Sequence, residues 1–248
     1  MAGDPLAWSP AALFRVEAGL LIRIGLEHNF ENRTLAWALD FPGCFAYGED
    51  EAAALLRLPG RLLEFDYWVR LHGGSNWFAL GNMDLHVDEV FTDYEIPGNG
   101  EPYVVNALFR HDLTPLTSEE ILKAEKIFTW QHQELLAGIE FADPALLERV
   151  YPGQRWSIQG ILSHLARAEM WYLQDLGFEP PQPDPQATPV DQLTQSYETV
   201  LQYLPQLADL ERLNTVFEEQ WTARKLVRRL LWHRRDHIDH IRQLMGIA

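Results

Sequence analysis

The sequence predicts an α+β protein of two domains, a small sheet-plus-helix domain over residues 1–116 followed by an all-α four-helix bundle over residues 117–248. Short β-rich runs separated by turns fill the chain up to Thr114, whereas long amphipathic segments fill the rest. Four such segments in about 130 residues pack most simply as a four-helix bundle. With 248 residues and 47% hydrophobic content, the chain is large enough to build both cores.

The N-terminal part alternates expected strands with turns. The strands are expected at residues 20–26, 34–39, 66–71, 77–80, 87–96 and 103–109. Gly73-Gly74 and the Pro-Gly-Asn-Gly run at 97–100 are strong turn signals between them. One helix interrupts the strands from about Glu49 to Leu63, and Pro59-Gly60 is expected to end or kink it.

The four bundle helices are expected at residues 117–140, 157–176, 188–203 and 222–245. Each begins at a hydroxyl residue whose oxygen can accept from the free N–H groups of a first turn: Thr117, Ser157, Thr188 and Thr222. Thr117 and Glu120 have the spacing of a capping box, and Gly177 closes the second helix. A short apolar piece lies at 144–150, and the proline-rich run at 179–185 predicts an extended crossover.

Composition excludes several classes of protein. The single cysteine, Cys44, rules out a disulfide framework and a cysteine-based zinc site. No signal peptide and no run of about 18 apolar residues is visible, so we expect a cytoplasmic protein with no membrane partner. A net charge of −16 disfavours nucleic acid as a partner. The basic stripe of the last helix is expected to dock on an acidic surface of the N-terminal domain or of a second copy, as in a homodimer: Arg224, Arg228, Arg235 and Arg242.

The last expected helix carries three histidines within eight residues. At about 100° per residue, His237 lies about 40° and His240 about 20° to either side of His233. All three leave the helix on one apolar face, shared with Leu226 and Leu230, which points to a core. Imidazoles one turn apart on such a face suit a transition metal, because a small rotation brings their nitrogens to a common point. The spacing therefore predicts a metal site.

The second bundle helix supplies a further histidine, His164, on its apolar stripe. The run Trp156-Ser-Ile through Ile-Leu-Ser-His-Leu-Ala-Arg-Ala-Glu169 resembles the second helix of the DinB/YfiT superfamily. His233-x-x-x-His237 followed by Ile-Arg resembles the last helix of that superfamily. The resemblance covers residues 117–248 and implies His164, His233 and His237 as metal ligands.

An alternative register pairs Asp236 with His240, since His240 stands where many members of the superfamily have glutamine. Three further residues are expected near the metal or the substrate: His240, Arg229 and Trp171. Arg229 lies one turn before His233 on the same face and is a candidate for binding an anionic thiol or a substrate carboxylate.

Three histidine ligands leave a coordination position for water or substrate, which is the layout of a catalytic site. The resemblance implies a metal-dependent enzyme, a thiol-dependent S-transferase or isomerase, that uses a low-molecular-weight thiol and a small-molecule substrate. Metal-assisted hydrolysis is the alternative reaction. Imidazole ligands admit Zn, Ni, Fe, Co or Mn, of which we expect zinc or nickel.

The N-terminal region carries a second resemblance. Trp37-Ala-Leu-Asp-Phe-Pro-Gly-Cys44-Phe-Ala-Tyr-Gly48-Glu-Asp-Glu is similar to HicB-like antitoxin domains, in which a turn joins two strands and an acidic pair opens a helix. That resemblance implies a module that binds a protein partner, with ligand sensing as the alternative role. The alternative function is therefore a non-catalytic scaffold, stabilised by metal, whose HicB-like domain binds a protein. A fourth protein ligand such as His240 would favour this scaffold over an enzyme.

Overall fold

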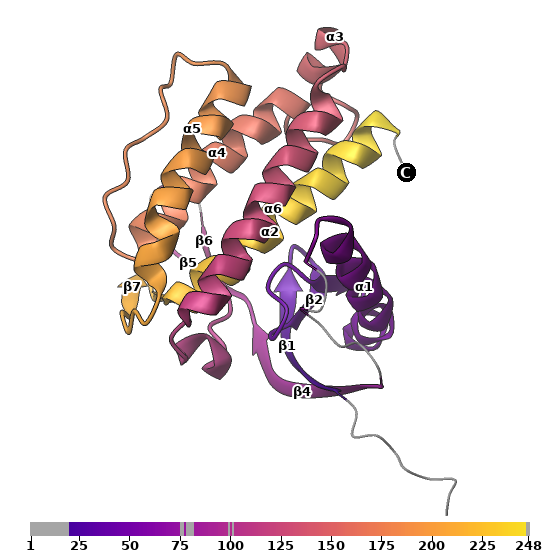
Figure 1. Cartoon of the computed structure of the whole chain (residues 1–248), viewed down its shortest axis with the longest axis vertical. Coiled ribbons are helices and arrows are strands. Elements are labelled where there is room, and N and C mark those ends of the chain that lie inside the picture. Colours follow the sequence, from indigo (N-terminus) through magenta and orange to yellow (C-terminus); the bar gives the residue numbers. More distant parts are fainter. Residues whose placement is uncertain (1–19, 75–76, 78–81, 99, 101, 247–248) are drawn as a thin grey trace, which may run out of the picture.

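A computed structural model describes residues 20–74, 77, 82–98, 100 and 102–246 (Figure 1). Its N-terminal part is built on a four-stranded sheet of order β3-β2-β1-β4, with strands β1 (Leu20–Phe30), β2 (Arg33–Ala38), β3 (Phe45–Gly48) and β4 (Met83–Thr92). The first three strands are antiparallel neighbours, and β4 pairs parallel to β1. Helix α1 (Glu51–Leu71) makes the crossover that a parallel pair requires.

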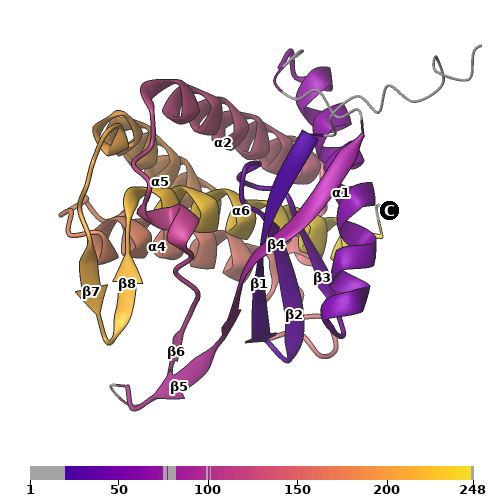
Figure 2. The ribbon, with the colours of Figure 1, turned by 90° about the horizontal axis from the view of Figure 1, so that it is seen from below.

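The central strand β2 is buried on both faces from Thr34 to Ala38. Figure 2 shows α6 passing behind the sheet and α1 beside it. Leu35 and Trp37 of β2 cluster with Trp232, which lies in helix α6 (Ala223–Met245). The alternating residues Ala36 and Ala38 belong to the cluster that contains the buried face of α1. The sheet therefore lies between α1 and α6, which explains why β2 is apolar from Leu35 to Ala38 instead of alternating.

Helix α1 is longer than the sequence predicts. It runs through Pro59 to Leu71, so the expected end at Leu63 and the expected strand at 66–71 are wrong. Its buried stripe crosses the proline without a break: Ala54, Leu58, Leu62, Phe65 and Val69. Burial of this stripe outweighs the cost of about 3 kcal/mol for an interior proline. The strand expected at 77–80 lies almost wholly outside the described residues.

The segment after β4 is more broken than expected. Asp93 separates β4 from β5 (Tyr94–Ile96), and β6 (Tyr103–Val105) pairs with β5 alone. The expected strand at 103–109 is correspondingly shorter, and a 3-10 helix comes after it, η2 (Arg110–Leu113). These elements lead the chain from the sheet to the bundle.

The C-terminal part contains the predicted bundle. Its long helices are α2 (Ser118–Ile139), α4 (Ile158–Asp175), α5 (Pro189–Tyr203) and α6. The four predicted hydroxyl caps all accept a backbone N–H, and Thr117 and Glu120 form the expected capping box. A short helix, α3 (Pro144–Glu148), and a 3-10 turn, η3 (Leu204–Leu207), complete it. The hairpin of β7 (Asn214–Val216) and β8 (Glu219–Trp221), which the sequence pattern does not predict, leads into α6.

The two parts share a hydrophobic core. One cluster of buried side chains joins Leu26 of the sheet, Phe65 of α1, Phe128 of α2 and Leu230 of α6. Trp232 enters an aromatic pocket of the sheet, with its ring centroid 5.2 Å from that of Phe30. Helix α6 is therefore both a bundle helix and the cover of one face of the sheet.

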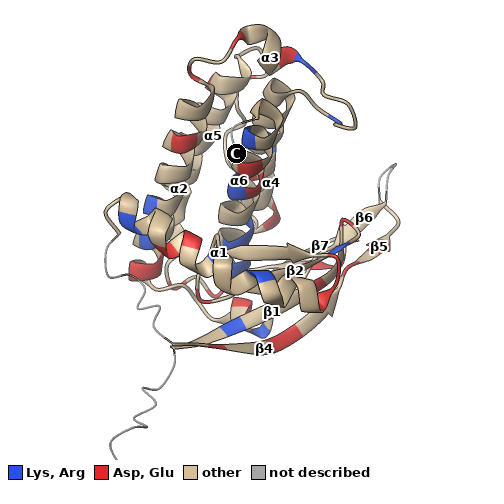
Figure 3. Ribbon diagram, turned by 90° about the vertical axis from the view of Figure 1, so that its right-hand side faces the viewer, with Lys and Arg blue, Asp and Glu red and all other residues tan. Residues whose placement is uncertain are grey.

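The four arginines of the predicted basic stripe of α6 are each paired with a carboxylate of the chain. Figure 3 marks the basic and acidic residues along the ribbon. Arg228 reaches Asp112 of η2, which lies in the predicted N-terminal region. Arg224 pairs with Glu120, and both Arg235 and Arg242 pair with Glu134. The stripe thus meets carboxylates of this same chain. Among the described helices, none is long and apolar enough to cross a membrane.

Candidate metal centre

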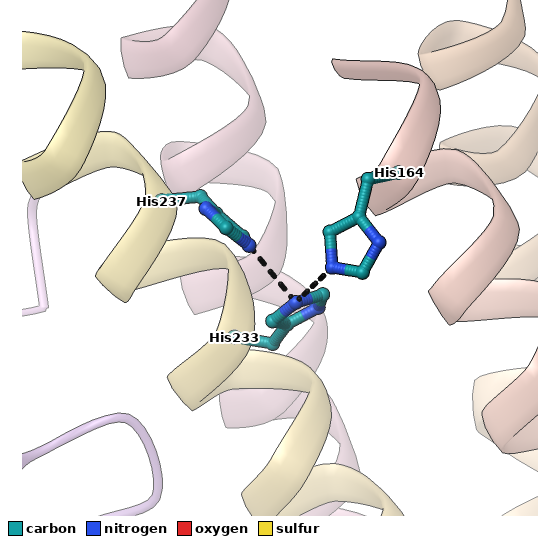
Figure 4. Close-up of side chains that lie close together, drawn as sticks. All are labelled: His164, His233 and His237. Carbon is teal, nitrogen blue, oxygen red and sulfur yellow. Dashed lines mark hydrogen bonds between the residues drawn. The ribbon is translucent and has the colours of Figure 1, made fainter. Parts of the chain in front are cut away.

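Three imidazoles meet between α4 and α6 (Figure 4). His164 extends from the second turn of α4, and His233 and His237 lie one turn apart on α6. The Nε2 atom of His233 is 3.0 Å from Nε2 of His164 and 3.0 Å from Nε2 of His237. The ligand atoms of all three lie within 4.8 Å of one another. This is the arrangement that helical spacing predicts for the two α6 histidines.

The two 3.0 Å distances from Nε2 of His233 match those between nitrogens that share one ion. Two nitrogens about 2.0–2.1 Å from a metal are about 2.8–3.4 Å apart for ligand angles between about 90° and 109°. Hydrogen bonding alone explains the cluster less well. A neutral imidazole nitrogen either donates one proton or accepts with one lone pair, so Nε2 of His233 can make only one good bond of the two. A metal ion at the centre uses all three lone pairs, so these residues fit a divalent cation.

Burial keeps the three imidazoles neutral, which is the form that binds metal. It lowers the pKa of His164 to about 4 and that of His237 to about 3, and it lowers the pKa of His233 well below the usual value. Neighbouring cations act in the same direction, with Arg167 and Arg155 acting on His164. The lone pairs are therefore free for a metal across the physiological pH range.

Aromatic side chains hold two of the rings in place. The indole of Trp156 stacks on His164 with centroids 4.4 Å apart, and Trp232 stacks on His233 at 5.5 Å. Tyr172 meets His233 edge-on from α4. Nδ1 of His233 and Nδ1 of His237 have no hydrogen-bond partner within the described part of the chain. Packing, more than hydrogen bonding, orients these ligands.

Two clefts are lined by histidines of the cluster. One, of about 560 Å³, is lined by His164 and His233. The other, of about 680 Å³, is lined by His237 and His240. Glu31 of the β1–β2 turn lies at the edge of both. The cluster thus lies on the floor of an open space and is not sealed inside the bundle.

The wall opposite the bundle comes from the N-terminal region. In the first cleft, this wall is contributed by the β1–β2 turn and the β4–β6 segment: Asn29, Phe30, Glu31, Asn32, Asp93, Glu95, Val104 and Asn106. Asn29, Glu31 and Asn32 all have positive φ, at 60°, 49° and 63°. Asparagine tolerates this conformation, but glutamate rarely adopts it, so the turn is strained at the lip of the cleft.

The structure brings together three of the predicted site residues and separates a fourth from them. His164, His233 and His237 converge, whereas Nε2 of His240 donates to Oε1 of Gln154 at 2.8 Å. Among the described residues, no further histidine, cysteine or carboxylate joins the group, so the alternative register with Asp236 and His240 assembles no cluster. Arg229 and Trp171 both line the first cleft, Arg229 buried and Trp171 38% exposed.

Sequence reasoning missed the N-terminal contribution to this site. Asp93, Asn106 and the β1–β2 turn lie far from the histidines in the chain, and helical spacing carries no information about them. Arg167, one turn after His164 and on the cleft, was also missed. The one local signal is Glu27, a carboxylate inside an apolar strand and fully buried, which indicates polar partners behind the cleft.

Comparisons with known proteins find one similar solved structure and no matching family. No family model and no curated protein matches the chain. Among solved structures, it is similar to YfiT from Bacillus subtilis, described as a probable metal-dependent hydrolase with an unusual four-helix bundle topology. The match has 22% identity and a TM-score of 0.44, and covers 54% of this chain and 91% of YfiT. At that level, nothing about activity transfers, and the evidence for function is the geometry of the site.

Proposed function

We propose that this protein is a metal-dependent enzyme that acts on a small molecule in the cleft between the sheet and the bundle. The observation that carries the proposal is the convergence of His164, His233 and His237, each of which lines one of the two open clefts, with no fourth protein ligand in the described chain. Three neutral imidazoles leave part of a metal's coordination sphere free, which is the layout of catalytic sites.

A divalent metal held there supplies Lewis-acid activation, which lowers the pKa of a water or thiol ligand toward neutrality. The chain's own residues supply the rest. Trp156 and Trp232 fix the ligand rings, and the sheet-side wall closes the cleft opposite them. Zinc or nickel is the proposed metal, because imidazole nitrogen suits both.

Within this class, the finer proposal is an S-transferase or isomerase that uses a low-molecular-weight thiol. The resemblance of the histidine helices to the DinB/YfiT superfamily supports it, as does the size of the cleft, about 560 Å³, which accommodates a drug-sized ligand. Metal-assisted hydrolysis uses the same site with water in place of the thiol. The reactions differ in product: the transferase leaves the thiol's sulfur bonded to the substrate, the isomerase returns the thiol unchanged, and hydrolysis needs no thiol.

The first test is metal content. Full-length protein, prepared without a histidine tag and loaded with zinc or nickel, should hold about one ion per chain by plasma mass spectrometry. His164→Ala, His233→Ala or His237→Ala should remove most of it, whereas His240→Ala and His132→Ala should retain it. Equal occupancy in His233→Ala and the unaltered protein would reject the site.

The second test separates the two reactions. Metal-loaded protein is assayed with monochlorobimane plus bacillithiol, mycothiol or glutathione, and separately with 4-nitrophenyl acetate and no thiol. Thioether formation that depends on His233 supports the transferase, and ester cleavage that depends on His233 supports the hydrolase. The absence of both reactions, in a protein that holds metal, would count against the transferase and the hydrolase and would leave the isomerase and the non-catalytic alternative.

One observation favours that alternative, a scaffold that binds a protein through its HicB-like region. Helix α1 exposes four large apolar side chains on one face: Leu56, Leu63, Tyr67 and Leu71, between 52% and 82% exposed. Such a stripe is typical of an interaction surface. Sedimentation equilibrium of the full chain and of Tyr67→Glu tests the simplest case, a second copy. A dimer that the substitution dissociates would support this function, and a monomer in both would exclude self-association through α1.

A further inference from the structure

The cleft beside the histidines has a buried cation in its floor. Arg229 lies on α6 one turn before His233, lines the same cleft, and is only 6% exposed. Trp232 and Phe30 flank its guanidinium, with ring centroids 4.5 Å and 5.3 Å from Cζ. Aromatic faces hold the charge in place and leave its N–H groups for other partners.

Few of those N–H groups are used. Nη2 donates to Oδ1 of Asn106 at 3.0 Å, while Nε and Nη1 have no hydrogen-bond partner in the part of the chain that the structure describes. The nearby carboxylate of Glu27 accepts from Trp37 and from the backbone N–H of Ala107 instead. Arg229 thus differs from its neighbour Arg228, whose guanidinium contacts Asp112 through two nitrogens. Glu27 and Glu219 act on the charge of Arg229, but neither accepts a hydrogen bond from its Nε or Nη1, so these two donors remain for an anionic ligand.

Other positive charges also surround the metal centre. Three neutral imidazoles do not compensate the two charges of a divalent ion, and the charged groups that act on His164 and His233 are arginines: Arg155, Arg167, Arg229 and Arg234. Arg234 is neutralised by Glu169. Arg167 is exposed, on the cleft, and in no salt bridge with a described residue. The space between the histidines and Arg229 therefore favours an anion.

The acidic residues that line the cleft repel an anion only weakly. Glu31 forms a salt bridge with Arg33, and Glu95 lies in the exposed β5 strand. Burial and the neighbouring Glu27 raise the pKa of Asp93 to about 8, so that this carboxyl is mostly neutral at pH 7. Among the described acidic residues that line the cleft, none therefore offers Arg229 or Arg167 an unpaired, ionised carboxylate beside the histidines.

We propose that the cleft binds the carboxylate of a small-molecule substrate, held by Arg229 beside the three-histidine centre, with the apolar body of the substrate against Trp171, Tyr172 and Trp232. The inference rests on the proposed metal function and names the substrate class for that site. A single guanidinium between aromatic walls suits a planar carboxylate attached to an aromatic or aliphatic body. Asn106 is a positioning residue, since its Oδ1 orients Arg229.

The experiment uses the full-length protein loaded with Co²⁺, whose visible absorption responds to changes at the site. Bound cobalt is counted first, and then phenylacetate and its uncharged analogue phenylacetamide are titrated by calorimetry and absorption. We expect phenylacetate to bind at least tenfold more tightly than the amide. Arg229→Gln should abolish that preference with cobalt content unchanged, and the matched control Arg242→Gln, on the same helix but paired with Glu134, should retain it.

Two further variants keep the test decisive if Arg229→Gln does not fold. Asn106→Ala should weaken phenylacetate binding at least threefold and leave phenylacetamide unaffected, and exposed Arg167→Ala should act in the same direction. Absence of bound cobalt would overturn the metal function and this inference with it. Bound cobalt with equal affinity for acid and amide, or an undiminished preference in the Arg229 or Asn106 variant, would overturn the carboxylate site alone.

Discussion

Asp112 and Arg228 form a buried ion pair in which Oδ2 lies 2.6 Å from Nη2, and it joins the segment after the sheet to the helix that carries two of the histidines. The guanidinium also donates to the carbonyl of Ala107 and lies over the ring of Trp37. Asp112 in turn accepts from the backbone N–H of Phe109. Each charge therefore has the other as its hydrogen-bonded counter-ion.

Asp112→Ala should lower the free energy of unfolding by about 3–5 kcal/mol, because it leaves the buried charge of Arg228 without this counter-ion. Urea denaturation monitored by circular dichroism measures this change. Glu119→Ala, which breaks the exposed pair between Glu119 and Lys123, serves as the control and should change little. A loss below about 1 kcal/mol for Asp112→Ala would show that Arg228 finds solvent in the folded protein.

The apoprotein should lose stability as the pH falls below about 6.5, in part through His132. Burial, aided by Arg234, lowers the pKa of this histidine to about 3, and its ring stacks on Tyr197. Since the unfolded chain takes up the proton first, the stabilisation is complete above pH 6.5 and is lost progressively toward pH 3. The three clustered histidines act with the same sign.

His132→Phe keeps the stacked ring and removes the proton-binding nitrogen. Between pH 6 and pH 4, its free energy of unfolding should fall by about 1.4 kcal/mol less per pH unit than that of the unaltered protein. Urea midpoints at several pH values give both slopes. Parallel slopes for the two proteins would mean that His132 is protonated in the fold.

Two glycines should respond to alanine in opposite directions. A Cβ at Gly48 would lie 2.2 Å from the backbone N of Ala54 and 2.5 Å from the carbonyl oxygen of Asp50, at the start of α1. A Cβ at Gly60 would meet nothing within 4 Å. Gly48→Ala should therefore destabilise by more than about 2 kcal/mol, because backbone atoms cannot move aside as a side chain can.

Gly60→Ala should instead stabilise by about 0.5–1 kcal/mol, because alanine loses less conformational freedom in a helix interior. Guanidinium denaturation of the two variants side by side gives both signs. A destabilised Gly60→Ala would indicate that the helix needs local freedom next to Pro59.

Metal should raise the melting temperature of the whole chain in one transition, because sheet and bundle share buried side chains. At a free metal concentration of about 100 times Kd, the stabilisation is about 2.7 kcal/mol. Differential scanning calorimetry with zinc and after chelation measures it, and His233→Ala should show no shift. Two separate transitions, with only one moved by zinc, would mean that the bundle unfolds independently.

The bundle was predictable because its signals are local. Thr117, Ser157, Thr188 and Thr222 each cap the helix that begins next to them, and a cap depends on residues within one turn. The end of α1 was not predictable in this way. Tyr67, Trp68 and Val69 favour a strand by propensity, and Pro59 favours a break, yet packing of the stripe from Ala54 to Val69 against the sheet and α2 decides for helix.

The site, too, combines features that local sequence predicts with features that depend on tertiary packing. The spacing of His233 and His237 fixes their common face, and the resemblance of the second bundle helix pointed to His164. The wall that Asn29, Asp93 and Asn106 provide depends on how the sheet lies against α6, and aromatic contacts far apart in the chain determine that placement.

Because Trp232 and His233 are adjacent in α6, one stretch of helix both anchors α6 to the sheet and presents a histidine of the cluster. The indole enters the sheet's aromatic pocket, and the next residue faces the other histidines. Inserting or deleting one residue anywhere between Arg228 and His237 would rotate the C-terminal remainder of the helix by about 100°, so that either the anchor or the ligands would turn away. Loops such as residues 179–185 can accept insertions and deletions, whereas the helix between Arg228 and His237 can accept only substitutions. An engineer who grafts the centre onto another scaffold must therefore move the anchor and the ligands together, as one uninterrupted helix.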